Sequence, residues 1–181
     1  MAKLISATYG DALFEVAISQ DKVDSLYDEA QAVLTSFKEN EDLMGFINHP
    51  KIGKEEKIKT IEAVYDKFVS REMTGFLVTI VDKDRGRNIP EIFEYFLDRV
   101  REYKKIGRAF VTTPMELSEE MKKRVEKKLL DTTEYVQFEM NYAVDSSLIG
   151  GMVIRIGDKI VDSSVKHKLE DLSRTLYRLD V

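Results

Sequence analysis

The side chains best suited to chemistry are few and far apart in this 181-residue chain. His49 and His167 are distant in sequence, and neither shows the His-x-x-x-His or carboxylate–histidine spacing that holds a metal ion. Cysteine is absent, so disulfides, thiolate metal ligands and cysteine nucleophiles are excluded. The sequence therefore predicts no metal site and no catalytic centre built on histidine or cysteine.

Serines and glycines offer two further chemical possibilities. The serine pairs at residues 146–147 and 163–164 lack a Gly-x-Ser-x-Gly elbow, so turns and helix caps explain them better than nucleophilic catalysis. The glycines at 150–151 and 157 could form a phosphate cradle, but neither the P-loop pattern nor Gly-x-Gly-x-x-Gly is present. We expect no catalytic residue and no cofactor. A small enzyme that uses this glycine-rich hairpin is the least favoured alternative.

The paired carboxylates Asp158 and Asp162 flank a predicted β-strand. Residues 153–156 and 160–161 favour two strands, and Gly157 followed by Asp158 is a favourable two-residue hairpin turn. Asp162 then stands where a helix cap is needed. A turn residue and a cap therefore explain these carboxylates better than acid–base catalysis.

The elements that must position these residues change type once along the chain. Apolar residues recur at helical spacing from Lys3 to about Ile106, which predicts six helices around residues 7–18, 23–37, 43–47, 58–68, 73–81 and 90–103. After Gly107 the pattern predicts strands at 109–112 and 136–144, a helix from Ser118 to Leu130, the hairpin, and a last helix from Ser164 to Leu179. The predicted fold class is α+β, with an N-terminal six-helix bundle (residues 1–105) followed by a small α/β domain of roughly four strands and two helices (residues 106–181).

The predicted fifth helix leaves two explanations open. From Met73 to Val81 it is apolar around most of its circumference, which is typical of a helix that is central or bound to something. It could lie wholly in the core. Alternatively, one of its faces could lie near the surface and accept an amphipathic partner helix.

Charge and hydropathy limit the partners. The net charge of −5 argues against nucleic acid, because phosphate binding relies on clustered Lys and Arg. The densest basic run, residues 122–128, contains an interleaved glutamate and predicts a solvated helix face, with contact to an acidic partner as the alternative. No signal pattern and no apolar run of the ~18–20 residues that span a membrane is present. We expect a cytoplasmic chain that neither crosses nor enters a bilayer.

One segment also carries a family signature. The stretch from Leu148 to Leu169 resembles the carboxyl-terminal motif of the delta subunit of bacterial F-type ATP synthases, whose mitochondrial relative is the oligomycin-sensitivity-conferring protein. The residues that carry the resemblance are Gly151, Val153, Ile154, Arg155, Gly157, Asp158, Asp162, Ser164, Val165 and Leu169. Residues 7–17 resemble the opening helix of that family, although Gly10 stands where alanine is usual.

The resemblance implies a non-catalytic stator subunit in the peripheral stalk. The N-terminal bundle would bind the alpha (and beta) subunits of the catalytic head, the C-terminal domain would bind the b subunits, and the link would resist rotor torque. The chain would lie on the cytoplasmic face of the bacterial cell membrane and associate with it only through the complex. An unrelated soluble adaptor that binds amphipathic helices is the alternative.

The resemblance also implies a partner-binding groove between the first and fifth helices, which takes up an amino-terminal helix of an alpha subunit. Mapped onto this sequence, the groove involves Tyr9, Leu13, Phe14, Ala17, Phe76, Val78 and Ile80.

Overall fold

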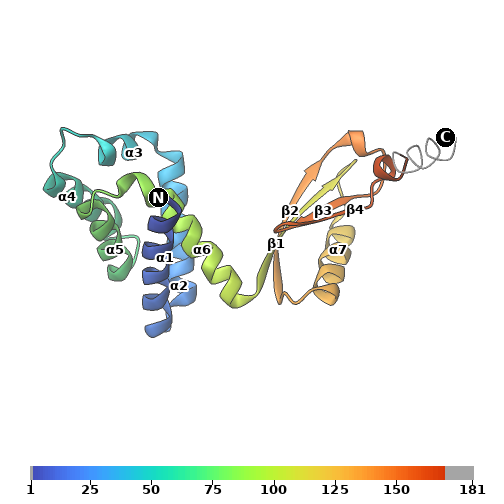
Figure 1. Ribbon diagram of the computed structural model, residues 1–181, viewed down its shortest axis with the longest axis horizontal. Helices are drawn as coiled ribbons and strands as arrows, with labels where there is room; N and C mark the ends of the chain where they lie inside the picture. Colours follow the sequence, from blue (N-terminus) through green and yellow to red (C-terminus); the bar gives the residue numbers. More distant parts are fainter. Residues whose placement is uncertain (1, 170–181) are drawn as a thin grey trace. The chain divides into compact units, whose positions relative to one another are not determined.

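The computed structural model describes the backbone of residues 2–169 and the side chains of residues 4–169. The chain forms two compact units, Met1–Arg101 and Glu102–Val181, which we call unit 1 and unit 2 (Figure 1). Unit 1 is helical, whereas unit 2 combines a four-stranded sheet with a helix. The predicted α+β fold class is confirmed.

Unit 1 is built from helices joined by short connections. They are α1 (Ala2–Ser19), α2 (Val23–Glu39), α3 (Glu41–Asn48), α4 (Lys54–Tyr65), α5 (Arg71–Asp82), the short 3₁₀ helix η1 (Gly86–Asn88) and α6 (Ile89–Lys104). α3 ends before Pro50, as predicted, because proline disfavours helical geometry in the residue that precedes it. α5 begins with Ser70 as its cap, whose hydroxyl accepts a hydrogen bond from the N–H of Met73 at 3.3 Å.

The core of unit 1 is one continuous apolar cluster that every α-helix of the unit enters. α6 contributes its two largest fully buried side chains, Phe93 and Phe96, together with Ile92, which is also completely buried. α1 approaches α6 closely at Gly10, where a β-carbon would collide with the ring of Tyr95. This contact explains why glycine stands where the resembling family usually has alanine, in spite of the cost of glycine within a helix.

α5 is amphipathic, whereas the sequence suggested that it is apolar around most of its circumference. Met73, Leu77 and Ile80 are buried, while Gly75 and Thr79 form part of a solvent-facing stripe at i, i+4 spacing. Because the residues on that stripe are small rather than charged, the sequence pattern suggested an apolar surface around most of the helix.

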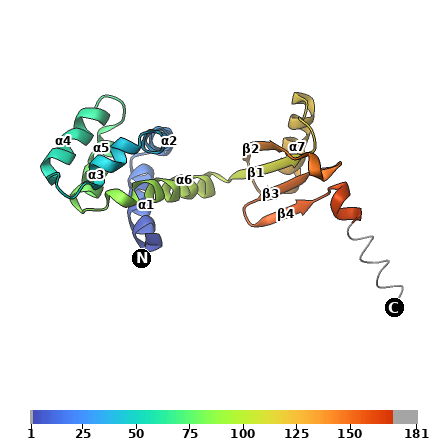
Figure 2. The same cartoon turned by 90° about the horizontal axis from the view of Figure 1, so that it is seen from above.

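Unit 2 is a mixed sheet with one helix on it. Its elements are β1 (Ile106–Thr113), α7 (Glu119–Thr132), β2 (Gln137–Val144), the 3₁₀ helix η2 (Ser146–Leu148), β3 (Val153–Ile156) and β4 (Lys159–Asp162). The strand order is β2-β1-β3-β4, seen in Figure 2, with β1 parallel to β2 and antiparallel to β3. β3 and β4 form the predicted hairpin.

α7 covers one face of the sheet. Ala109, Leu129 and Phe138 form the buried centre of this packing, and the hydroxyl of Tyr142 donates a hydrogen bond to the carbonyl of Lys122 at 3.3 Å. Ser118 caps α7 as predicted. Residues 165–169 are helical, in agreement with the predicted last helix, whose remaining residues up to Leu179 lie outside the described part of the chain.

Candidate functional site

The predicted groove residues divide into two sets by burial. Leu13, Ala17 and Ile80 lie in the core of unit 1, with at most 2% of each residue exposed, so in this structure they stabilise the bundle itself.

The other four groove residues, Tyr9, Phe14, Phe76 and Val78, are partly buried at the edge of the core. They retain surface that a partner could cover. The groove therefore stays a prediction, and these four residues are the ones through which a partner helix could make contact.

The groove residues of α1 are held in place by α6. The hydroxyl of Tyr95 donates hydrogen bonds to both carboxylate oxygens of Asp11, at 3.2 and 3.3 Å. The guanidinium of Arg99 lies 5.5 Å from the ring centre of Phe14, within the range of a cation–π contact, and its Nε lies 3.5 Å from the Asp11 carboxylate. Phe14 is therefore oriented by a charged neighbour.

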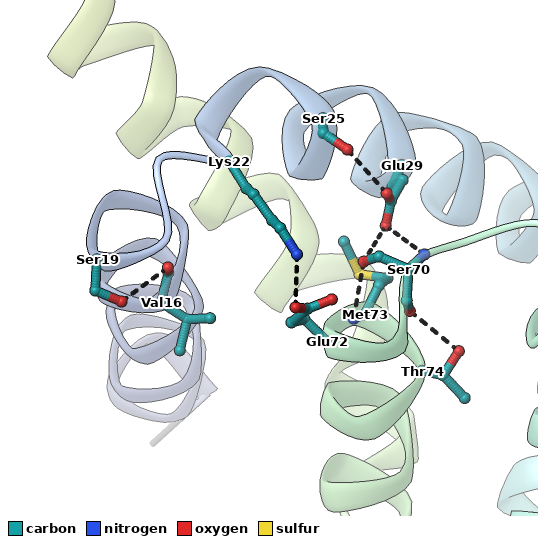
Figure 3. Close-up of polar contacts among 9 residues, drawn as sticks. All are labelled: Val16, Ser19, Lys22, Ser25, Glu29, Ser70, Glu72, Met73 and Thr74. Carbon is teal, nitrogen blue, oxygen red and sulfur yellow. Dashed lines mark hydrogen bonds and ion pairs between the residues drawn. The ribbon is translucent and has the colours of Figure 1, made fainter.

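Contacts with neighbouring elements also hold the groove residues of α5 in place. Phe76 makes an edge-to-face contact with Phe93 of α6 at 5.9 Å between ring centres. Lys22, in the connection after α1, reaches Glu72 on α5 with its ammonium 2.7 Å from the carboxylate, as Figure 3 shows. The hydrogen bond from Lys22 lowers the pKa of Glu72, so this link is ionised at neutral pH.

A second polar link fixes the start of α5 to α2. The carboxylate of Glu29 accepts hydrogen bonds from both the N–H and the hydroxyl of Ser70, at 2.9 and 2.7 Å (Figure 3). Ser70 is also the cap of α5, so its bonds to Glu29 tie the first turn of α5 to α2. This pair could not be predicted from the sequence, because Glu29 and Ser70 lie 41 residues apart.

The family-motif residues of unit 2 have structural roles where the hairpin meets the following helix. Gly157 has φ 54° in the β3–β4 turn, and Gly151 has φ 77°. A β-carbon on Gly151 would collide with the carbonyl oxygen of Ser163. Glycine is therefore needed at 151 both for its backbone angle and for a close approach of two backbone segments.

Asp162 and Ser164 hold the turn into the last helix. The carboxylate of Asp162 accepts a hydrogen bond from the N–H of Ser164 at 2.8 Å, and this bond lowers the pKa of Asp162. The buried hydroxyl of Ser164 accepts a hydrogen bond from the N–H of His167 at 3.2 Å, as a helix cap does. The predicted hairpin turn is observed, with Asp158 as an exposed turn residue. The cap of the last helix is Ser164 rather than Asp162, whose carboxylate holds the turn before that cap.

The sheet face opposite α7 forms a second candidate surface, which we call the open sheet face. By the alternation of side chains along each strand, it carries Phe110, Val153, Arg155 and Ile160. These residues line a shallow concavity of about 390 Å³. The Arg155 guanidinium lies 4.7 Å from the ring centre of Phe110, and Ile160 is 64% exposed.

Sequence reasoning assigned Arg155 to the motif but missed the surface to which it belongs. The signal was present in the alternation of β1 and β3, yet only the strand order brings Phe110 opposite Arg155. Leu169, the last motif residue described, is 53% exposed.

Among residues 2–169, no helix is long and apolar enough to span a membrane. The same part of the chain holds no cluster of three or more metal-ligating side chains.

The described chain thus combines a helical unit and a sheet unit, and each has partly buried apolar side chains at the edge of its core. A sequence profile of the ATP synthase delta (OSCP) subunit family matches residues 5–176. The chain belongs to this family.

Relatives agree over the full length of the chain. It is 51% identical to ATP synthase subunit delta of Lachnoclostridium phytofermentans, over 100% of both chains. It is 33% identical to ATP synthase subunit delta of Nostoc, over 95% of this chain and 93% of that one. Among solved structures, a chain of the Toxoplasma gondii mitochondrial ATP synthase hexamer has the same fold, with a TM-score of 0.72 at 19% identity over 95% of this chain and 97% of that chain.

The structural role assigned to Gly151 can be tested by substitution. Gly151→Ala should lower the free energy of unfolding of unit 2 by about 3 kcal/mol, because it combines a left-handed backbone with a collision against Ser163. Gly157→Ala is the matched control, since its φ is also positive but no atom lies within 4 Å of the new β-carbon, and it should cost only about 1–2 kcal/mol. Amide hydrogen exchange of β3 and β4 in the full chain measures both losses, and equal losses would contradict the assigned role.

Proposed function

We propose that this chain is the non-catalytic stator subunit that ties the catalytic head of an F-type ATP synthase to the b subunits of its peripheral stalk. The family match over residues 5–176, which spans both units, is the observation that carries the proposal. Each unit has its own apolar core, which suits a linker that must be attached at two ends. The subunit would be peripheral, on the cytoplasmic side of the membrane, and held there only by its partners.

Unit 1 is the proposed attachment to the head. An amino-terminal amphipathic helix of an alpha subunit would pack its apolar stripe on Tyr9, Phe14, Phe76 and Val78. Partly buried side chains of this kind still have apolar area to lose to a partner, and covering a few hundred Å² contributes several kcal/mol at roughly 25 cal/mol per Å². Ordering of the partner helix offsets part of this gain, which leaves micromolar binding within reach.

Unit 2 is the proposed attachment to the b subunits, through the open sheet face. Phe110, Val153 and Ile160 supply an apolar strip for one face of a b-subunit helix. Arg155 lies on the same strip, so an acidic side chain of the partner would find a guanidinium group there.

An adaptor that binds amphipathic helices outside any ATP synthase is the second candidate. It is favoured by the partly exposed groove residues alone, which would serve any helix of suitable pattern. Failure of the chain to associate with a purified catalytic head would favour the adaptor over the stator.

The groove predicts a position-specific effect on head binding. Val78→Glu should weaken binding of an alpha-subunit amino-terminal peptide by roughly tenfold or more, because it places a charge in the apolar contact. Thr79→Glu is the matched control, since the neighbouring Thr79 lies on the solvent-facing stripe of α5. Titration of the peptide into the labelled chain measures both affinities. Equal weakening, or resonance shifts confined to unit 2, would refute the proposed groove.

The open sheet face predicts a face-specific effect on b binding. Ile160 and Val161 are adjacent in β4 and similarly exposed, at 64% and 62%, yet their side chains point to opposite faces of the sheet. Ile160→Asp should weaken binding of a soluble b-subunit fragment by roughly tenfold, whereas Val161→Asp should leave it nearly unchanged. Sedimentation or calorimetric titration measures the affinity of each variant for the fragment. A larger loss with Val161→Asp than with Ile160→Asp would place the b contact on the α7 face and contradict the proposal.

A further inference from the structure

Unit 1 has a concave surface that none of the seven predicted groove residues lines. It has a volume of about 640 Å³ and lies where the end of α3, the start of α4, the end of α5 and η1 meet. We call it the basic cavity. Its lining residues of interest are the charged Lys54, Lys57, Asp84, Arg85 and Arg87 and the apolar Ile47, Ile52 and Val81.

The charge of the basic cavity is opposite to that of the whole chain. Four lining side chains are cationic and one is a carboxylate, while the chain carries −5. The ammonium of Lys54 lies 2.7 Å from the Asp84 carboxylate, so these two charges compensate each other. Within the described part of the chain, Lys57, Arg85 and Arg87 form no ion pair shorter than 4.0 Å, although the Asp84 carboxylate also attracts Lys57 and Arg85. Four cations against one carboxylate leave the cavity with a net positive charge for a ligand.

Hydrogen bonds hold the backbone that forms the basic cavity. The N–H of Arg85 donates to the carbonyl of Ile80 at 2.9 Å, and the Arg85 carbonyl accepts from the N–H of Asn88 at 2.8 Å. The Lys54 ammonium also donates to the carbonyl of Asp82 at 2.7 Å, which ties the start of α4 to the end of α5. A preset backbone limits the conformational entropy lost on binding to the ordering of the cationic side chains.

Gly86 sets the position of the two arginines. It is buried against Ile47, and a β-carbon there would collide with that side chain. The backbone can therefore pass close to α3 at Gly86. Arg85 and Arg87, the residues on either side of Gly86, both line the cavity. Ile47 and Val81 are buried below, and Ile52 is half-buried, so the floor between the cations is apolar.

We propose that the basic cavity binds an acidic segment of a partner protein. Carboxylates of Asp or Glu would pair with Arg85, Arg87 and Lys57, because the planar guanidinium fork matches a carboxylate. An aliphatic side chain between those acids would rest on the apolar floor, which an inorganic anion could not use. This proposal goes beyond the stator function and does not depend on the groove between α1 and α5.

The test uses the full-length, isotopically labelled chain at low salt and the capped peptide Glu-Glu-Leu-Glu-Glu as the probe. The amide resonances of residues 52–57 and 85–88 should shift, and the peptide with glutamine in place of every glutamate should bind at least tenfold more weakly. The double variant Arg85→Gln/Arg87→Gln should weaken binding of the acidic peptide about tenfold. Lys67→Gln/Arg71→Gln removes the same charge from exposed positions of unit 1 outside the cavity and should change binding less than twofold.

Three results would overturn the proposal. They are absence of shifts at the cavity residues, equal weakening by the control pair, and tighter binding of tripolyphosphate than of the acidic peptide at the same residues. The last result would assign the cavity to a phosphate-bearing ligand instead. Binding of the alpha-subunit peptide in the groove is measured separately, so failure here and failure of the stator function are distinguishable.

Discussion

Unit 1 depends on the apolar face of α6, against which the other long helices are placed. Phe96 and Phe93 of that face are completely buried. α1 comes close enough to α6 at Gly10 that no β-carbon fits, and α5 meets the apolar face through Phe76. On the exposed side of α6, the end of α2 is linked to it by an ion pair between Lys38 and Glu94 at 2.6 Å. The positions of α1 and α5, and so of any groove between them, follow from their shared packing on α6.

In unit 2 the corresponding constraint is the central position of β1, which pairs with β2 on one side and β3 on the other. One face of β1, with Ala109 and Val111, is buried toward α7. Its other face presents Phe110, to which the strand pairing brings Arg155. Among residues 2–169, α7 packs on one face of the sheet, and the other face is left open to a partner. In the proposed function, this open sheet face is the second point of attachment.

Local features of the fold could be predicted from the sequence, and features made by tertiary packing could not. The hairpin turn at Gly157 and the capping role of Ser164 follow from short-range rules, and both are observed. Periodicity identified the apolar face of α1, but it could not tell that Leu13 would be covered by other helices while Phe14 stays partly exposed. The basic cavity was missed because its residues come from two stretches, 47–57 and 81–88, that meet only in the folded unit.

In the proposed function, the chain transmits tension between unit 1, bound to the head, and unit 2, bound to the stalk, which requires that the two units be covalently joined. The most direct measurement is ATP-driven ion pumping by membranes stripped of their own subunit and reconstituted with this chain. We expect the intact chain to restore pumping. We expect an equimolar mixture of fragments 1–105 and 106–181, each shown to be folded, to leave ATP hydrolysis intact without pumping. Full pumping with the separated fragments would contradict the account.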